Sequence, residues 1–134
     1  RGKISGAILD RIDLCITAGI PDVGTIHGSR GSIDSKTMQE KVMQAVKMQK
    51  QRFAGTKIRF NSGIPASEIK KYCHLESREE KFMDEVFVSA NLSLRSYHKI
   101  LKVARTIADL EESNTIENHH LSEALCYRLQ EDNT

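Results

Sequence analysis

The sequence predicts an all-α fold: a helical bundle preceded by a flexible N-terminal segment. Three observations support this class. Apolar residues recur at helical spacing over most of the chain from residue 35 onward. Residues that favour helix starts precede several of these stretches. One stretch, Leu94–Leu110, is apolar around most of its circumference, as expected of the helix at the centre of a bundle.

Composition indicates one soluble globular domain with an attached segment. The chain has 134 residues, of which 39% are apolar and 28% charged. No apolar run approaches the roughly 18 to 20 residues of a membrane-spanning helix, and the first residues lack a signal-peptide stretch. We therefore expect a cytoplasmic protein with no membrane partner. Cys15, Cys73 and Cys126 are odd in number and far apart, which argues against a disulfide framework. The net charge of +2 does not by itself indicate nucleic-acid binding.

The first 34 residues show two different patterns. Ile4, Ala7, Ile8 and Ile12 recur at helical spacing, and residues 14–17 then alternate as a short strand does. A single strand cannot form a sheet, so its partners are expected outside this sequence. Residues 19–34 are rich in glycine and small polar residues, which is typical of a flexible linker.

The first helix of the bundle is expected to begin after Asp34 or Ser35, either of which is a suitable N-cap, and to end at Gly55. Its apolar stripe is expected to face the core. The stripe comprises Met38, Val42, Ala45, Val46 and Phe53.

Further start signals follow along the chain. Pro65 suits the first turn of a short helix. Ser77 followed by Glu80 reads as a capping box that opens another helix. Ser93 is placed to cap the central helix, and a last helix is expected after Thr115. No period repeats, which excludes a solenoid.

Motifs of catalysis or metal binding are not evident. The glycine-rich stretch at residues 28–32 lacks the order G-x-x-x-x-G-K-[ST] of a phosphate loop. His119 and His120 are adjacent, so on a helix they point about 100° apart, and we expect no metal site there. No serine, histidine and acid set indicates a hydrolase. The chain alone is expected to be no enzyme and to hold no cofactor.

Basic residues are concentrated between Lys36 and Arg59, where Glu40 is the single acid. A basic helix face can contact phosphates without reading sequence. The alternative is a solvated face that keeps the bundle soluble. No aromatic residues interleave with the charges, which weakens the case for single-strand stacking. Both interpretations stay open, and the nucleic-acid candidates are Lys41, Lys47, Lys50 and Arg52.

Three stretches together resemble one known family. They are ISGAILDRIDL at residues 4–14, LSLRSYHKILKVARTIADL at residues 92–110 and HLSEALCYR at residues 120–128. In this order they resemble the C-terminal part of magnesium-chelatase-like AAA+ ATPases of the ComM type. The sequence departs from that family at Ala7, where proline is expected, and in the glycine-rich linker.

The resemblance implies a division into three parts. Residues 1–18 would be the end of an α/β ATPase core, residues 19–34 a linker, and residues 35–134 the helical lid. The phosphate loop would lie upstream in a full-length ATPase that uses ATP and magnesium. Arg11 matches the arginine finger, which acts in trans on the neighbouring subunit's γ-phosphate. Arg95 matches the second-sensor arginine, which acts on its own subunit's nucleotide. The plainer alternatives are that Arg11 pairs with Asp10 or Asp13 and that Arg95 is a surface residue.

The same resemblance implies a homo-oligomeric ring, a hexamer, with ATP at the subunit interface and the upstream core as the lid's first partner. Nucleotide state would set the lid angle and so become subunit motion. In ComM-like proteins this motion is thought to drive DNA through the ring, a helicase-like DNA-processing activity. In true magnesium chelatases it drives metal insertion into a porphyrin. A third possibility is a free-standing helical module that binds nucleic acid or a protein through residues 36–59.

Overall fold

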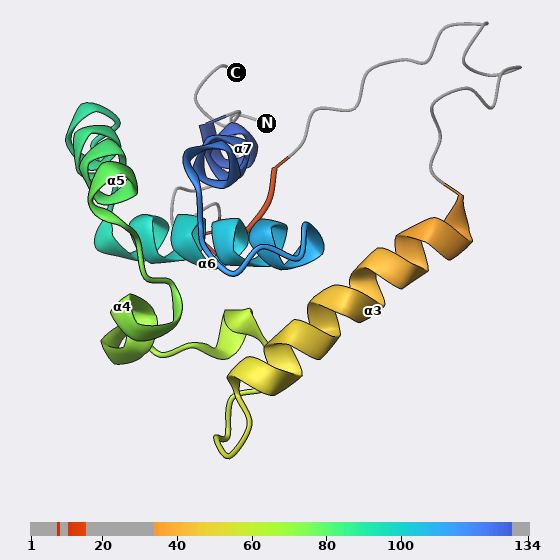
Figure 1. Ribbon diagram of the computed structural model, residues 1–134. Coiled ribbons are helices and arrows are strands. Elements are labelled where there is room, and N and C mark those ends of the chain that lie inside the picture. Colours follow the sequence, from red (N-terminus) through yellow and green to blue (C-terminus); the bar gives the residue numbers. More distant parts are fainter. Residues whose placement is uncertain (1–7, 9–10, 16–33, 130–134) are drawn as a thin grey trace, which may run out of the picture.

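The computed structural model describes residue 8, residues 11–15 and residues 34–129, and the elements in these residues are all helical. The predicted all-α class is confirmed. Leu14 and Cys15, where the short strand was expected to begin, lie in irregular backbone. The predicted linker lies outside the described residues except for its last residue, Asp34. In chain order the elements are α3 (Ser35–Arg52), η1 (Asn61–Gly63), η2 (Ala66–Glu68), α4 (Ile69–Tyr72), α5 (Ser77–Ser89), α6 (Leu94–Leu110) and α7 (Asn118–Leu129) (Figure 1).

Helix α6 is the central helix, as its apolar circumference predicts. It crosses the middle of the bundle, with α5 and α7 on one side and α3 and α4 on the other (Figure 1). Ser93 caps it as expected, because its Oγ accepts a hydrogen bond from the backbone nitrogen of Ser96 at 3.0 Å. Ala104 and Ala108 are fully buried, which lets the neighbouring helices approach α6 closely.

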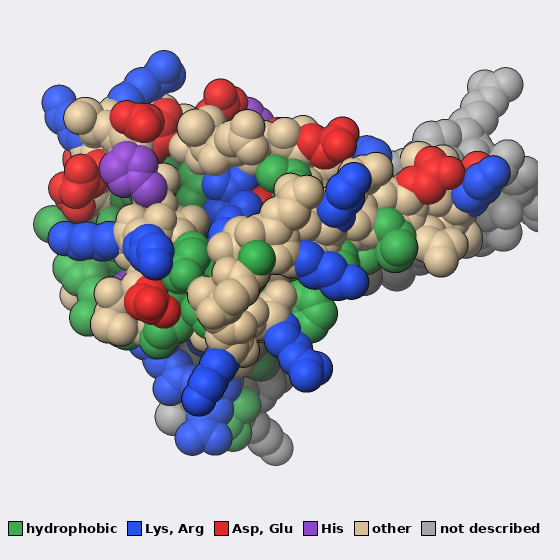
Figure 2. Space-filling model, turned by 60° about the horizontal axis from the view of Figure 1, so that its bottom comes forward, with side chains coloured by type: hydrophobic (Ala, Val, Ile, Leu, Met, Phe, Trp, Pro, Cys, Tyr) green, Lys and Arg blue, Asp and Glu red, His purple; other side chains and the backbone are tan. Residues whose placement is uncertain are grey.

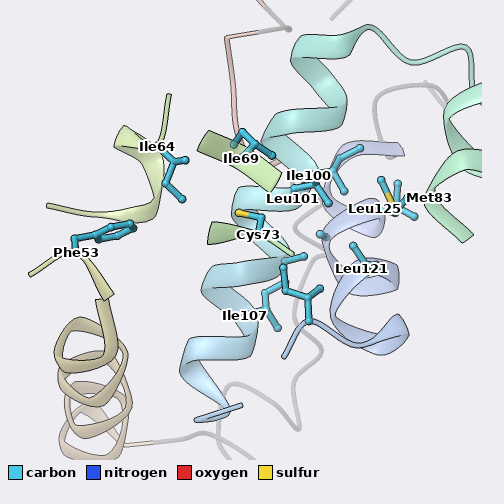
Figure 3. Close-up of a cluster of buried hydrophobic side chains, with 13 residues drawn as sticks. Phe53, Ile64, Ile69, Cys73, Met83, Ile100, Leu101, Ile107, Leu121 and Leu125 are labelled. Atoms are coloured by element: carbon cyan, nitrogen blue, oxygen red, sulfur yellow. The ribbon is translucent and has the colours of Figure 1, made fainter. Parts of the chain in front are cut away.

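One apolar core joins these elements. Met83 of α5 and Leu121 of α7 are fully buried in this core, and Met83 lies beside Leu125 of α7 (Figure 3). Burial of a side chain of this size stabilises the fold by about 1.5 to 3 kcal/mol. The remaining core residues come from α6, α7, the loop between these two helices and the segment between α3 and α5: Phe53, Ile64, Ile69, Cys73, Ile100, Leu101, Ala104, Ile107, Ile116, Ala124 and Leu125.

Helix α3 packs through only part of its predicted stripe. Its start is as expected, since Oδ1 of Asp34 accepts from the backbone nitrogen of Thr37 at 2.7 Å. Ala45 is buried, but Met38 and Val42 are each 54% exposed. The expectation that these two side chains face the core is wrong for this structure. A helix of 18 residues is about 27 Å long, and its N-terminal half extends past the other helices (Figure 1).

The capping box expected at the start of α5 does not form. Ser77 is the first helical residue, and Glu76 holds the N-cap position without a side-chain hydrogen bond. Glu79 and Glu80 lie in the first turn, where negative charge is favourable at a helix N-terminus. None of the helices in the described residues is long and apolar enough to cross a membrane.

Candidate functional site

A groove with a volume of about 1050 Å³ runs along one face of α6. Lys41 of α3, Tyr127 of α7 and the irregular segment at Asp13 and Leu14 form its sides. The groove therefore brings together residues from both ends of the chain. Arg95, the predicted second-sensor residue, is one of its lining residues.

A row of basic side chains from α6 lines the groove. Arg95, His98, Lys99 and Lys102 are spaced at i, i+3, i+4 and i+7, so they lie on the same face of the helix. Burial lowers the pKa of His98, and the positive charge of Lys102 lowers it further. Asp13, Glu111 and Glu123 line the same groove, so part of this positive charge is balanced. A cation that stays exposed in a concave surface attracts anions.

Two members of this row are already bonded within the chain, whereas Arg95 is exposed. Nζ of Lys99 lies 3.0 Å from Oδ1 of Asp13, and Nζ of Lys102 donates to the backbone oxygen of Ser62 at 3.1 Å. Within the described part of the chain, no hydrogen bond or ion pair holds the guanidinium of Arg95. Arg95 is therefore free to turn toward an anion in the groove.

Arg11 is exposed and does not line the groove, but its segment is attached to the bundle. The backbone nitrogen of Cys15 donates to the backbone oxygen of Tyr127 at 3.0 Å. Asp13, one of the two acids considered as partners of Arg11, pairs with Lys99 instead, while Asp10 lies outside the described residues. The segment that carries Arg11 thus lies against α6 and α7.

The basic residues of α3 do not form one face. Lys41, Lys47 and Lys50 are all exposed. At about 100° per residue, Lys47 and Lys50 lie about 60° apart, whereas Lys41 lies about 180° from Lys50. Figure 2 shows Lys and Arg side chains spread around the visible face of the molecule rather than gathered in one patch. Of the three lysines, only Lys41 shares the groove with Arg95.

Arg52, the fourth nucleic-acid candidate, is bonded inside the protein. Its Nη1 and Nη2 donate to the two carboxylate oxygens of Asp109 at 2.9 and 2.6 Å. Its Nη1 also donates to Oδ1 of Asn61 at 2.9 Å. Only 16% of its side chain is exposed. Arg52 connects α3 to α6, and its guanidinium is not presented to solvent as a basic face would require.

Arg105, a buried arginine of the same network, was not among the residues that the sequence pattern indicated. Nε of Arg105 donates to Oδ1 of Asp109 at 3.2 Å, and its Nη1 and Nη2 donate to the backbone oxygens of Asn114 and Ser113. Burial lowers the pKa of Arg105, although the Asp109 carboxylate acts in the opposite direction. The available signal was an arginine and an aspartate at i and i+4 on the most apolar helix.

His119 and His120 converge on one carboxylate, contrary to the expectation from their spacing. Their Nε2 atoms lie 2.9 and 2.7 Å from Oε2 of Glu111. The angle of 100° between successive residues gives only the direction in which each side chain leaves the helix axis. Glu111 lies on the loop before α7, and both imidazole rings turn toward it. The ring centroids are 3.9 Å apart.

The hydrogen bonds of His120 limit what this cluster can bind. Its Nδ1 accepts a hydrogen bond from the backbone nitrogen of Glu117 at 2.9 Å, in the manner of the third helical residue of a capping box. The ring proton therefore lies on Nε2, which donates to Glu111. A metal ion needs a free lone pair on that nitrogen. In this arrangement Glu111, His119 and His120 are a hydrogen-bonded cluster rather than three available metal ligands.

Comparison with known proteins identifies relatives over nearly the whole chain. Residues 32–128 match the family described as magnesium chelatase, subunit ChlI C-terminal. The chain is 36% identical over 128 residues to the uncharacterized protein YifB of Salmonella typhimurium. It is 38% identical over 128 residues to the competence protein ComM of Haemophilus influenzae. Each alignment covers 94% of this chain and 24% of the relative, so the chain spans about a quarter of these proteins.

Proposed function

Since this chain belongs to the magnesium chelatase subunit ChlI C-terminal family, we propose that it is the helical lid of a ring-forming, ATP-dependent DNA-processing motor of the ComM type. The lid couples ATP hydrolysis to subunit motion. The observation that carries the proposal is the placement of Arg95, which is exposed in the first turn of α6 at a groove lined by further basic side chains.

Arg95 contacts the phosphates of the ATP that its own subunit binds. A guanidinium presents a planar fork of N–H donors that matches phosphate oxygens. Phosphoryl transfer spreads charge over the three equatorial oxygens, and a fixed cation at that point stabilises the transition state. The N-terminal end of α6 adds positive potential at the same place. Movement of the phosphates then changes the position of α6 and with it the lid.

Arg11 acts on the neighbouring subunit's ATP in the same proposal. Its exposure and its attachment to α6 and α7 through residues 12–15 are the properties required of a residue that reaches across a subunit boundary. An arginine finger of this kind raises the hydrolysis rate by about 10³ to 10⁵. The motor is a homo-oligomeric ring, a hexamer, in the cytoplasm, and it uses ATP and magnesium.

DNA is the proposed substrate because of the relationship to the competence protein ComM. The alternative within the family is a magnesium chelatase lid, which would act on a porphyrin. A free-standing nucleic-acid or protein binding module has one observation in its favour, the exposure of Lys47 and Lys50 on α3.

The proposal is tested by Arg95→Ala in the full-length ATPase. The chain offers a matched control, since Arg78 is exposed and occupies the same second position of α5 that Arg95 occupies in α6. Loss of a guanidinium that stabilises developing phosphate charge costs a few kcal/mol, which lowers kcat by about 10² to 10³. Arg78→Ala should hydrolyse ATP at the parental rate. Equal rates for both variants would contradict the proposal and favour the binding module.

A further inference from the structure

Arg128, in the last turn of α7, joins two segments that are far apart in the sequence. Its Nη1 donates to the backbone oxygen of Ile12 at 2.7 Å, and its Nη2 donates to Oγ of Ser96 at 2.7 Å. The residue is only 8% exposed. One guanidinium therefore fixes the N-terminal segment relative to the first turn of α6.

The two acceptors have the same relation to the two proposed ATPase arginines. Ile12 directly follows Arg11, and Ser96 directly follows Arg95. Because a guanidinium is a rigid planar fork, it holds both partners in a fixed geometry. We propose that Arg128 is a positioning residue that joins Arg11 and Arg95 into one unit, so that the nucleotide sites on the two sides of a subunit are coupled. This inference rests on the proposed function.

Two neighbouring contacts also attach the segment that carries Arg11 to α6 and α7. Next to Arg128, the backbone oxygen of Tyr127 accepts a hydrogen bond from the nitrogen of Cys15 at 3.0 Å. One turn along α6 from Arg95, Nζ of Lys99 lies 3.0 Å from Asp13. The N-terminal segment is thus attached to both helices, and Arg128 is the side chain that bonds to the segment and to the first turn of α6 together.

The bond to Ser96 reaches the cap of α6. Ser93 accepts from the backbone nitrogen of Ser96 at 3.0 Å and donates from its own Oγ to that of Ser96 at 3.1 Å. Arg128 therefore bonds to the turn that sets the direction of Arg95. When phosphate release lets α6 move, this hydrogen-bonded chain carries the displacement to Ile12 and so to Arg11. Hydrogen-bond networks that alternate between two arrangements can carry energetic coupling between distant sites.

The test is Arg128→Lys in the full-length ATPase. Lysine keeps the positive charge but cannot donate to Ile12 and Ser96 in the geometry of the guanidinium. Arg11 and Arg95 would then no longer be held in a fixed position relative to each other. We expect kcat to fall about tenfold or more, because a misplacement of about 1 Å can cost about 10²-fold in rate. The KM for ATP should stay near the parental value, and the Hill coefficient for ATP should fall toward one.

Arg105→Lys is the matched control, because Arg105 is also buried but bonds to Asp109 and to the loop after α6. We expect it to lower the melting temperature while the folded ring keeps the parental Hill coefficient. A merely structural role for Arg128 predicts the same behaviour for Arg128→Lys, and that result would overturn the inference.

Ser96→Ala decides the matter if Arg128→Lys does not fold, because it removes one acceptor and leaves the arginine in place. We expect a smaller fall in kcat and in the Hill coefficient, with Ser122→Ala, an exposed serine of α7, as the parental control. Parental values for Ser96→Ala, or a parental ring whose Hill coefficient is already one, overturn the coupling. If Arg95→Ala lowers the rate but Arg128→Lys is parental, only this inference fails. If Arg95→Ala is itself parental, the proposed function fails.

Discussion

Arg52 of α3 and Asp109 of α6 form a bidentate ion pair across 57 positions of sequence, with N–O distances of 2.9 and 2.6 Å. Asp109 has no exposed side-chain area and also accepts from Asn61 and Arg105. A buried carboxylate is tolerated only when its charge is paired and its lone pairs are bonded. This pair therefore fixes where α3 crosses α6, and α3 and α6 both contribute to the groove.

Arg52→Ala is expected to destabilise the helical bundle strongly. Removing one partner of a buried ion pair leaves the other charge poorly compensated, which costs about 3 to 5 kcal/mol. Because Arg105 still bonds to Asp109 in this variant, the loss in free energy of unfolding should lie near the lower end of that range. Urea unfolding monitored by circular dichroism measures the change. Lys50→Ala, an exposed residue of the same helix turn, should change the free energy of unfolding by no more than about 0.5 kcal/mol. Equal effects of the two changes would show that the pair does not hold α3.

The cysteines should differ in reactivity toward a thiol reagent. Burial raises the pKa of the Cys73 thiol to about 11, and the side chain lies in the core. Cys126 is exposed on α7. Because the thiolate is the reactive form, Cys126 should be alkylated in the native protein and Cys73 only after unfolding. Mass spectrometry of peptides after brief iodoacetamide treatment measures this order. Rapid native labelling of Cys73 would contradict the packing of α4 against the core.

Stability should depend on pH through His119. The hydrogen bond to Glu111 raises the pKa of His119 above its ordinary value of 6.5. When the pKa of a histidine is higher in the folded state than in the unfolded state, its protonation stabilises the fold. This stabilisation is complete at pH values below the unfolded-state pKa, and it is lost as the pH rises through the folded-state pKa. The parent should therefore lose stability relative to His119→Gln as the pH rises above the ordinary histidine pKa of 6.5. Melting temperatures across this range measure the difference, and parallel curves for the two proteins would rule out the contribution.

The helices were predictable because their signals are local. Asp34 and Ser93 cap helices as their residue types and positions indicate, and the apolar circumference of residues 94–110 identifies the central helix. One local signal failed, the capping box expected at Ser77. The other failures concern what a local pattern cannot contain. Whether Met38 packs depends on how far α3 extends beyond its neighbours, and this length relation exists only in the assembled bundle.

The site was predictable only in part for the same reason. The resemblance proposes Arg11 and Arg95 as site residues from matching stretches, and this stays a prediction. No sequence pattern shows that Arg128 bonds to the residues that follow them. The basic run on α3 suggested that Arg52 belongs with its lysines. Its partner Asp109 lies on another helix, so the pairing depends on tertiary packing.

The most direct test of the proposed function is ATP hydrolysis by mixed rings of the full-length protein, which we propose to be a ring-forming ATPase. Arg11→Ala subunits have an intact phosphate loop but no finger, and subunits with a disabled phosphate loop still carry Arg11. Mixing the two should restore ATP hydrolysis, because a finger acts on the neighbour's nucleotide. Mixing Arg95→Ala subunits with the same partner should restore none, since Arg95 serves its own subunit's site. Parental hydrolysis by both arginine variants before mixing, in rings shown to be assembled, would contradict the account.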